Sequence, residues 1–442
     1  MRIIDYYMSS ERDRETWLDS FSITSGLRYF GGKSVIGKYL MNRICNMACR
    51  MTENGKKPHI FIDAFAGGGK IALSIPEGWF DMIVLNDLNY GVYSFFKSCK
   101  EKPLALVKLI EEIGEVYDEN MFRYFTLNRA HGNQKKSESY RKRKQLCKIK
   151  LMDISADEAK EISGIEHYDF YEAHFKYMYK EPVNELVAAA MTYFVTQTSW
   201  NGDTEPATVT YRLSVADNKE GNFSAFNEKE KIERMVNRAK KHVFHVHNMM
   251  VKKNIVVENL DYRELIKKYN GKEFSDLTGT IDKNDSYTAK NILWYFDPPY
   301  HPATLAGGKP AAYEDTFPIQ MTLEMTKILH NDKDYIEKYG ELFYFIKSDY
   351  CPKDCYDDKK KALDFAKQKY AEKWNKGNAT QQDKDIVDKL QKAVDELKDH
   401  YHDFDCLEEG EYYREEIGTF SKGGEGTENN KTKGTEFVWC RG

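Results

Sequence analysis

The chain has 442 residues, enough for two or three domains, and its net charge of −4 excludes a protein that binds nucleic acid through overall positive charge. No stretch approaches the ~18 consecutive apolar residues of a membrane span, and residues 1–20 are too polar for a signal peptide, so we expect a cytoplasmic protein. The eight cysteines lack zinc-finger spacing, which predicts free thiols and no metal site.

A double glycine follows a polar leader that we assign to residues 1–25. Residues 27–34 have the sequence Leu-Arg-Tyr-Phe-Gly-Gly-Lys-Ser, and a helical pattern begins at Ile36. A ligand can approach the backbone closely at two glycines. Lys33 could then meet a carboxylate, and Tyr29 could cover an aromatic ligand. The alternative is a loop that begins a helix and carries a solvated lysine.

Residues 59–73 predict a strand, a glycine turn and a helix. The turn contains Phe65, Gly67 and Gly69, and Asp63 precedes it where a carboxylate could accept from an ammonium group. The turn is neither the dinucleotide fingerprint nor a Walker loop. A second strand at 83–85 ends in Asp87, about 20 residues past the turn, where nucleoside-binding folds hold ribose hydroxyls. The alternative is a cap for a helix that starts at Leu88, and Asp87 could serve as both.

Residues 100–245 depart from the alternation of strands and helices. They hold a basic run of Arg141, Lys142, Arg143 and Lys144, which is either a solvated helix face or a set of phosphate contacts. An apolar helix at 187–196 leads to Trp200, Asn201 and Gly202, and Asn-Gly is a hairpin signal. The tryptophan is either a core anchor or a wedge between bases. A charged helix is predicted at 228–241.

The chain returns to strand and helix at residues 254–263, with Asp261 as the expected N-cap. A buried strand at 292–296 then stops at Asp297, Pro298, Pro299 and Tyr300. The Asp297 carboxylate and the Pro298 carbonyl could accept hydrogen bonds from an exocyclic amino group and free its lone pair. Tyr300 offers a face for stacking a base. The alternative is a strand that ends in a Pro-Pro turn with a capping acid.

Later elements are a helix at 319–330, a buried strand at 342–346, a charged helical hairpin at 353–403 broken near residues 375–378, and a terminal antiparallel hairpin. Taken in their order along the chain, the motifs described above resemble those of the Dam-like, alpha-order N6-adenine DNA methyltransferases. The resemblance covers residues 1–100, 185–350 and 412–442. The resemblance implies a Rossmann-like α/β fold with a doubly wound mixed sheet that ends in an antiparallel hairpin. It also implies a mostly helical target-recognition insertion with a β-hairpin.

The implied chemistry is transfer of a methyl group from S-adenosyl-L-methionine to a flipped adenine in a specific sequence of double-stranded DNA, without a metal. The roles that the resemblance implies fall into three groups. Catalysis would use Asp297, Pro298, Pro299 and Tyr300. Cofactor binding would use Tyr29, Lys33, Asp63, Phe65, Gly67, Gly69, Asp87, Asp261 and Asp297. DNA contacts would come from Arg141, Lys142, Arg143, Lys144, Trp200 and Asn201.

Two features depart from the family pattern. Family members often have Trp where Tyr29 stands, and acids at Asp203 and Glu205 replace the basic residues of relatives that read GATC. We assign the domains as catalytic at 1–100 and 247–350, target recognition at 101–246, a charged helical insert at 351–404 and a terminal β-hairpin at 405–442. The insertions could add DNA contacts, set a longer target or mediate a homodimer.

The expected setting is a prokaryotic or phage-infected cell, with the protein at the nucleoid. It would serve a restriction–modification system, a mobile element or an orphan regulator. Two alternatives stay open. The same fold could act on RNA or on a protein amide. Such enzymes usually lack a large insertion before the strand that leads to Asp297–Tyr300, the DPPY motif. The chain could also be an inactive DNA-binding homologue, against which the joint presence of Lys33, Asp87, Asp297 and Tyr300 argues.

Overall fold

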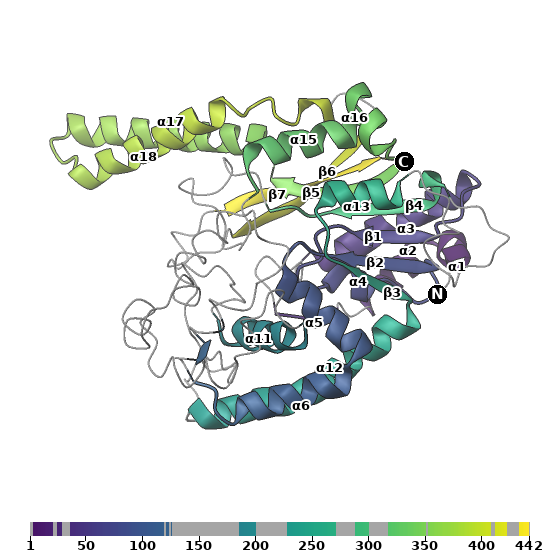
Figure 1. Ribbon diagram of the computed structural model, residues 1–442. Coiled ribbons are helices and arrows are strands. Elements are labelled where there is room, and N and C mark those ends of the chain that lie inside the picture. The colour runs from purple at the N-terminus through teal and green to yellow at the C-terminus, as the bar shows by residue number, and fades with distance from the viewer. Residues whose placement is uncertain are drawn as a thin grey trace. The chain divides into compact units, whose positions relative to one another are not determined.

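The computed structural model describes residues 3–20, 24–28, 36–118, 121–122, 125, 185–199, 228–270, 288–299, 317–350, 352–407, 412–421 and 433–441. Figure 1 shows their helices and strands. The described residues form two compact units, one that runs up to Tyr295 and one that begins at Phe296.

The first unit contains four parallel strands in the order β3-β2-β1-β4. They are β1 (Ile60–Asp63), β2 (Met82–Asn86), β3 (Ile255–Glu258) and β4 (Ile292–Phe296), the last of which ends in the second unit. Every residue of β1, β2 and β4 is buried. Continuous apolar runs such as these suit parallel strands that are covered on both faces. The predicted strand at 292–296 is confirmed, and the one at 83–85 is one residue longer at each end.

Beyond the leader, the helices of the first unit cover the sheet and pack on one another. They are α3 (Gly37–Glu53), α4 (Lys70–Ser74), α5 (Tyr90–Glu101), α6 (Pro103–Gly114), α11 (Glu185–Thr198), α12 (Glu228–Lys252) and α13 (Tyr262–Tyr269). The pair α5 and α11 and the pair α6 and α12 pack together (Figure 1). At the first crossing a Cβ on Gly91 would lie 2.2 Å from Thr192 Oγ1, so only glycine allows this approach.

Two predictions about helices in this unit need correction. The helix predicted at 228–241 continues to Lys252, because buried residues recur at helical spacing at Ala239, Val243, Val246 and Met250. The leader at 1–25 contains two helices, α1 (Ile3–Met8) and α2 (Glu11–Asp19). Ser10 caps α2. The leader also contributes to the core. Tyr6 is fully buried, and Trp17 stacks on Trp79 with 6.0 Å between the ring centroids.

The second unit holds three strands in the order β5-β7-β6, all paired antiparallel. They are β5 (Tyr344–Tyr350), β6 (Tyr412–Ser421) and β7 (Lys433–Arg441), so the predicted terminal hairpin is confirmed. The predicted strand at 342–346 is misplaced, because β5 runs on through three polar residues. Lys347 and Asp349 can lie inside because they form an ion pair, with 2.7 Å between Nζ and Oδ2.

The helices of the second unit are α15 (Ile319–His330), α16 (Lys333–Tyr339), α17 (Pro352–Asn375) and α18 (Gln381–Lys398). Single 3-10 turns occur at η4 (Ala289–Asn291) in the first unit and η7 (Asp405–Leu407) in the second. The predicted helix at 319–330 is confirmed. The predicted charged hairpin is also confirmed as α17 and α18, which pack side by side (Figure 1). Three large apolar side chains of this hairpin are nevertheless exposed, since the exposed fractions of Phe365, Trp374 and Ile386 are 58%, 66% and 48%.

These elements confirm the predicted fold class, an α/β fold of Rossmann type. The six cysteines within the described ranges are free, as predicted. The predicted domain boundaries stay a prediction. The predicted recognition hairpin near residues 200–211 lies outside the described residues.

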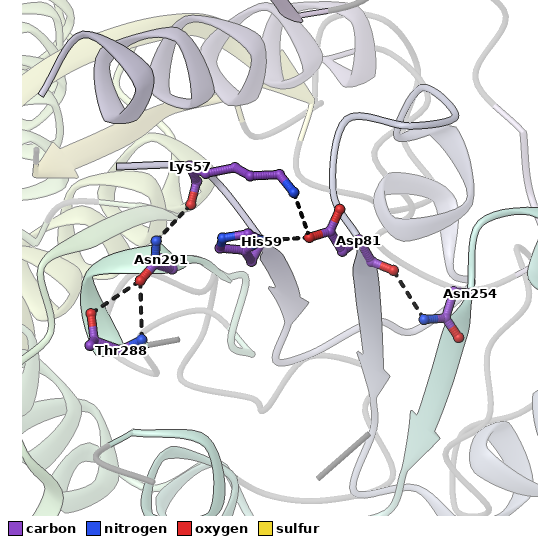
Figure 2. A network of polar contacts seen from close by, with 6 residues as sticks. All are labelled: Lys57, His59, Asp81, Asn254, Thr288 and Asn291. Atoms are coloured by element: carbon purple, nitrogen blue, oxygen red, sulfur yellow. Dashed lines mark hydrogen bonds and ion pairs between the residues drawn. The ribbon is translucent and has the colours of Figure 1, made fainter. Parts of the chain in front are cut away.

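A polar network joins the amino ends of the four parallel strands. Figure 2 shows its members, which are Lys57, His59, Asp81, Asn254, Thr288 and Asn291. Asp81 Oδ2 lies 2.5 Å from His59 Nδ1 and 3.1 Å from Lys57 Nζ. The amides of Asn254 and Asn291 donate to the carbonyls of Asp81 and Lys57 at 3.0 and 2.9 Å. The network therefore fixes the amino ends of these four strands.

This network predicts an acid-sensitive contribution to stability. Burial alone would raise the pKa of Asp81, but hydrogen bonds from His59 and Lys57 hold that pKa below its ordinary value. A carboxylate with a lower pKa in the folded chain stabilises the fold fully above its unfolded pKa of about 3.9 and loses this contribution as the pH falls through the folded value. We expect Asp81→Asn to lower the Tm at pH 7, with a smaller difference below about pH 4. Calorimetry across this range tests it, and an equal difference at pH 7 and pH 3 would contradict it.

Candidate active site

The glycine turn lies at the carboxyl end of β1. Asp63 closes the strand and is 1% exposed, and the next N–H, that of Ala64, donates to the Tyr295 carbonyl of β4 at 3.0 Å. Gly67 and Gly69 have φ angles of 49° and 70°, in the left-handed region that favours glycine. A Cβ on Gly69 would also lie 2.6 Å from Phe96 Cζ. The predicted glycine turn is therefore confirmed, and its positive φ angles strain any other residue placed at 67 or 69.

Asp87 joins this turn to the end of the neighbouring strand β2. Its Oδ2 accepts from the Gly67 N–H at 2.7 Å, and its Oδ1 accepts from the Asn89 N–H at 2.8 Å. Asp87 is partly exposed, whereas Asp63 is buried. The alternative role as a helix cap is wrong, because α5 begins at Tyr90 and its N-cap is Asn89. The glycine turn and Asp87, which the sequence pairs only by spacing, are therefore in direct contact.

Two asparagines that the sequence analysis did not assign hold the strand ends together. Asn86 is fully buried, and its Nδ2 donates to the carbonyls of Ala64 and Leu260 at 2.9 and 3.0 Å. Asn259 Nδ2 donates to the Asp87 carbonyl at 2.8 Å. These amides tie the ends of β1, β2 and β3 at one edge, beside the backbone of Asp87. The sequence signals are Asn86, directly after the apolar run 82–85, and Asn259, one residue past the apolar run 255–257.

Phe65 and the start of α13 meet at the same edge. The rings of Phe65 and Tyr262 lie 5.9 Å apart. Asp261 is the N-cap of α13, as predicted, and accepts from the Arg263 N–H at 2.9 Å. Both of its oxygens also accept from the Arg263 guanidinium, at 2.7 and 2.9 Å. A cofactor contact at Asp261 would compete with this arginine, and that role stays a prediction.

The segment before the double glycine is attached to the glycine turn. The N–H groups of Gly26 and Leu27 donate to the Gly68 carbonyl at 2.9 and 3.1 Å. Lys70, the first residue of α4, is partly withdrawn from water beside the turn, and this burial lowers its pKa. Tyr29 and Lys33 lie outside the described residues.

The DPPY motif begins the second unit, and its acid has a defined partner there. Asp297 is partly exposed, and its Oδ1 accepts from Ser348 Oγ of β5 at 2.8 Å. Pro298 is buried and Pro299 is partly exposed, while Tyr300 lies outside the described residues. The predicted DNA contacts also lie outside them, namely Arg141, Lys142, Arg143, Lys144, Trp200 and Asn201.

Residues 29–190, which hold the glycine turn and Asp87, match one family model. They match the D12 class N6 adenine-specific DNA methyltransferases. The D12 class match confirms the predicted resemblance to Dam-like enzymes and supports adenine methylation of DNA as the class of activity. The match ends before Asp297, so the DPPY residues depend on their own motif and surroundings. No curated protein matches the chain.

Across the described ranges, no group of three or more histidines, cysteines and acids is arranged to hold a metal ion. Among the helices of those ranges, none is long and apolar enough to cross a membrane.

Proposed function

We propose that the chain transfers a methyl group from S-adenosyl-L-methionine to the N6 amino group of a flipped adenine within a specific sequence of double-stranded DNA. One observation carries the proposal. Asp63 is the last residue of β1, and Asp87 and Asp297 directly follow β2 and β4, and these three parallel strands are adjacent in the order β2-β1-β4. Because parallel strands end at one edge, and α/β sheets bind ligands at that edge, the three acids are candidates for one site.

Covalent geometry supports this convergence for the DPPY acid. Asp297 follows Tyr295 by two residues, so their Cα atoms cannot be more than about 7 Å apart. The Tyr295 carbonyl in turn accepts from Ala64 of the glycine turn at 3.0 Å. The Tyr295 end of β4 therefore lies beside the glycine turn, and we propose that Asp297, two residues further on, contributes to the same site.

The residues of the first unit fit a nucleoside cofactor. The partly exposed Asp87 carboxylate would accept from ribose hydroxyls, and Gly67 and Gly69 would let the ligand approach the backbone. Phe65 would contact the ligand with its partly exposed ring. Tyr29, Lys33, Asp63, Asp261 and Asp297 complete the proposed cofactor residues. S-adenosyl-L-methionine supplies an electrophilic methyl group on its sulfonium when bound.

Residues of the DPPY motif would prepare the acceptor. An adenine amino group is a poor nucleophile because its lone pair is delocalised into the ring. Hydrogen bonds from that amino group to the Asp297 carboxylate and the Pro298 carbonyl would localise the lone pair on nitrogen. Tyr300 would stack on the base, which must leave the duplex at a cost of a few kcal/mol. Catalysis would then depend on positioning and electrostatics.

A methyl-transfer assay tests the proposal. The full chain is incubated with cofactor labelled in its methyl group and with unmethylated genomic DNA, and labelled positions are mapped at single-base resolution. The account predicts label on N6 of adenines that share a sequence. Label on cytosine, on RNA or on a protein amide, or no transfer by a folded chain that binds DNA, would contradict it.

The basic run at residues 141–144 is the best candidate for phosphate contacts in a chain of net charge −4. We expect replacement of its four cations by Gln to weaken DNA binding and to lower the slope of log K against log salt by about 0.9 for each phosphate that is no longer neutralised. Binding titrations at several salt concentrations measure this slope. A matched variant in which Lys360, Lys361, Lys367 and Lys369 of α17 become Gln controls for net charge. An unchanged slope in the first variant would show that the run is only a solvated surface.

A further inference from the structure

Strand β5 carries three consecutive polar residues that are all fully buried: Lys347, Ser348 and Asp349. Side chains alternate between the two faces of a strand, so Ser348 points to the face opposite its two charged neighbours. Buried polar groups need partners, and these groups have them. Their arrangement divides β5 into a face that anchors the strand and a face that contacts the DPPY acid.

The anchoring face is an ion pair inside an aromatic cage. Lys347 Nζ lies 2.7 Å from Asp349 Oδ2, and both side chains are 0% exposed. The same nitrogen lies 4.4 Å from the ring centroid of Phe404 and 5.0 Å from that of Trp439. Cation–π contacts at these distances are attractive. Pairing with β7, in which Ser348 lies opposite Val438, fixes the strand further.

The opposite face makes one directed contact with the DPPY motif. Ser348 Oγ lies 2.8 Å from Asp297 Oδ1. An ionised carboxylate only accepts hydrogen bonds, so the serine hydroxyl is the donor. A donor fixed on a buried strand restricts rotation of the carboxyl group and stabilises its charged form.

We propose that Ser348 is a positioning residue for methyl transfer, which fixes the Asp297 carboxylate in its charged form with Oδ2 turned toward the acceptor amino group. The inference depends on the proposed function, because it assigns Asp297 the task of accepting from adenine. Lys347 and Asp349 hold β5 in the register that presents the serine.

The test compares Ser348→Ala and Ser348→Cys with Ser98→Ala, which removes another buried serine from α5 outside the site. We expect Ser348→Ala to lower kcat roughly tenfold, with an unchanged KM for cofactor. The acid limb of its kcat profile should move to higher pH, because the carboxylate loses a donor to its charged form. Cysteine is a weaker donor of similar size, so the kcat of Ser348→Cys should lie between those of the wild type and Ser348→Ala. The kcat and pH profile of Ser98→Ala should match those of the wild type.

Two results would overturn the inference while leaving the proposed function intact. One is a folded Ser348→Ala chain with the kcat and pH profile of the wild type. The other is a loss of kcat that accompanies an equal loss of cofactor binding and of Tm, which would make the serine merely structural. If Ser348→Ala fails to fold, Ser348→Cys decides by the same readouts. A wild-type chain that transfers no methyl group would instead end the proposed function, and the inference with it.

Discussion

Asp297→Ala is expected to lower kcat for methyl transfer about a thousandfold or more, a loss of ~4 kcal/mol of transition-state stabilisation. The Asp297 carboxylate would accept from the adenine amino group while the nitrogen turns tetrahedral, and alanine offers no acceptor. Asp297→Asn keeps an amide oxygen and should retain part of the activity. Single-turnover rates with labelled cofactor measure the chemical step separately from binding.

The same assay contains its control. Asp385→Ala removes an exposed aspartate of α18, in the same unit, which accepts only from Gln381 among the hydrogen bonds described for it. That variant should keep wild-type activity, and both variants should bind DNA and cofactor as the wild type does. An Asp297→Ala chain that still methylates adenine at a near-normal rate would remove the proposed mechanism.

Lys347→Met should destabilise the second unit by about 3–5 kcal/mol. The substitution removes a fully buried cation and leaves the Asp349 carboxylate in the interior without it. Methionine has a similar length, so lost charge compensation rather than lost volume dominates the effect. Urea denaturation followed by tryptophan fluorescence measures the change in the free energy of unfolding.

An exposed pair on α18 provides the matched control for this substitution. Lys392 Nζ lies 3.9 Å from Glu396 Oε1, and the two side chains are 80% and 48% exposed. Exposed pairs at this spacing contribute about 0.3–0.5 kcal/mol, so Lys392→Met should change stability little. If the two substitutions lower the free energy of unfolding equally, burial of the ion pair does not determine the loss of stability. That result would contradict the role of Lys347 as the anchor of β5.

The parallel part of the fold could be predicted from the sequence because its strands are continuous apolar runs. Ile292–Phe296 stops at two prolines, which cannot extend a ladder, so both the strand and its end are visible. β5 was misplaced because three polar residues follow its apolar start. Nothing local in the sequence shows that Lys347 and Asp349 pair inside the fold. The two leader helices were missed because few apolar residues mark short helices that depend on tertiary packing.

The candidate site was predictable where one residue type is required. The glycines at 67 and 69 adopt positive φ angles, and the acid at Asp87 follows the next strand at the expected spacing. Residues that act through others were not visible. Asn86 is recognisable as a tie between strand ends only once the Ala64 and Leu260 carbonyls are in place, since they are far from one another in the sequence.

The most direct measurement is a crystal structure of the full chain with bound S-adenosyl-L-methionine. The central claim is that Asp87 and Asp297, separated by some two hundred residues, act on one bound molecule. The account predicts that Asp87 accepts hydrogen bonds from the ribose hydroxyls while the sulfonium methyl group faces the Asp297 carboxylate. A cofactor bound to one of these acids in a cavity that the other does not reach would contradict the account.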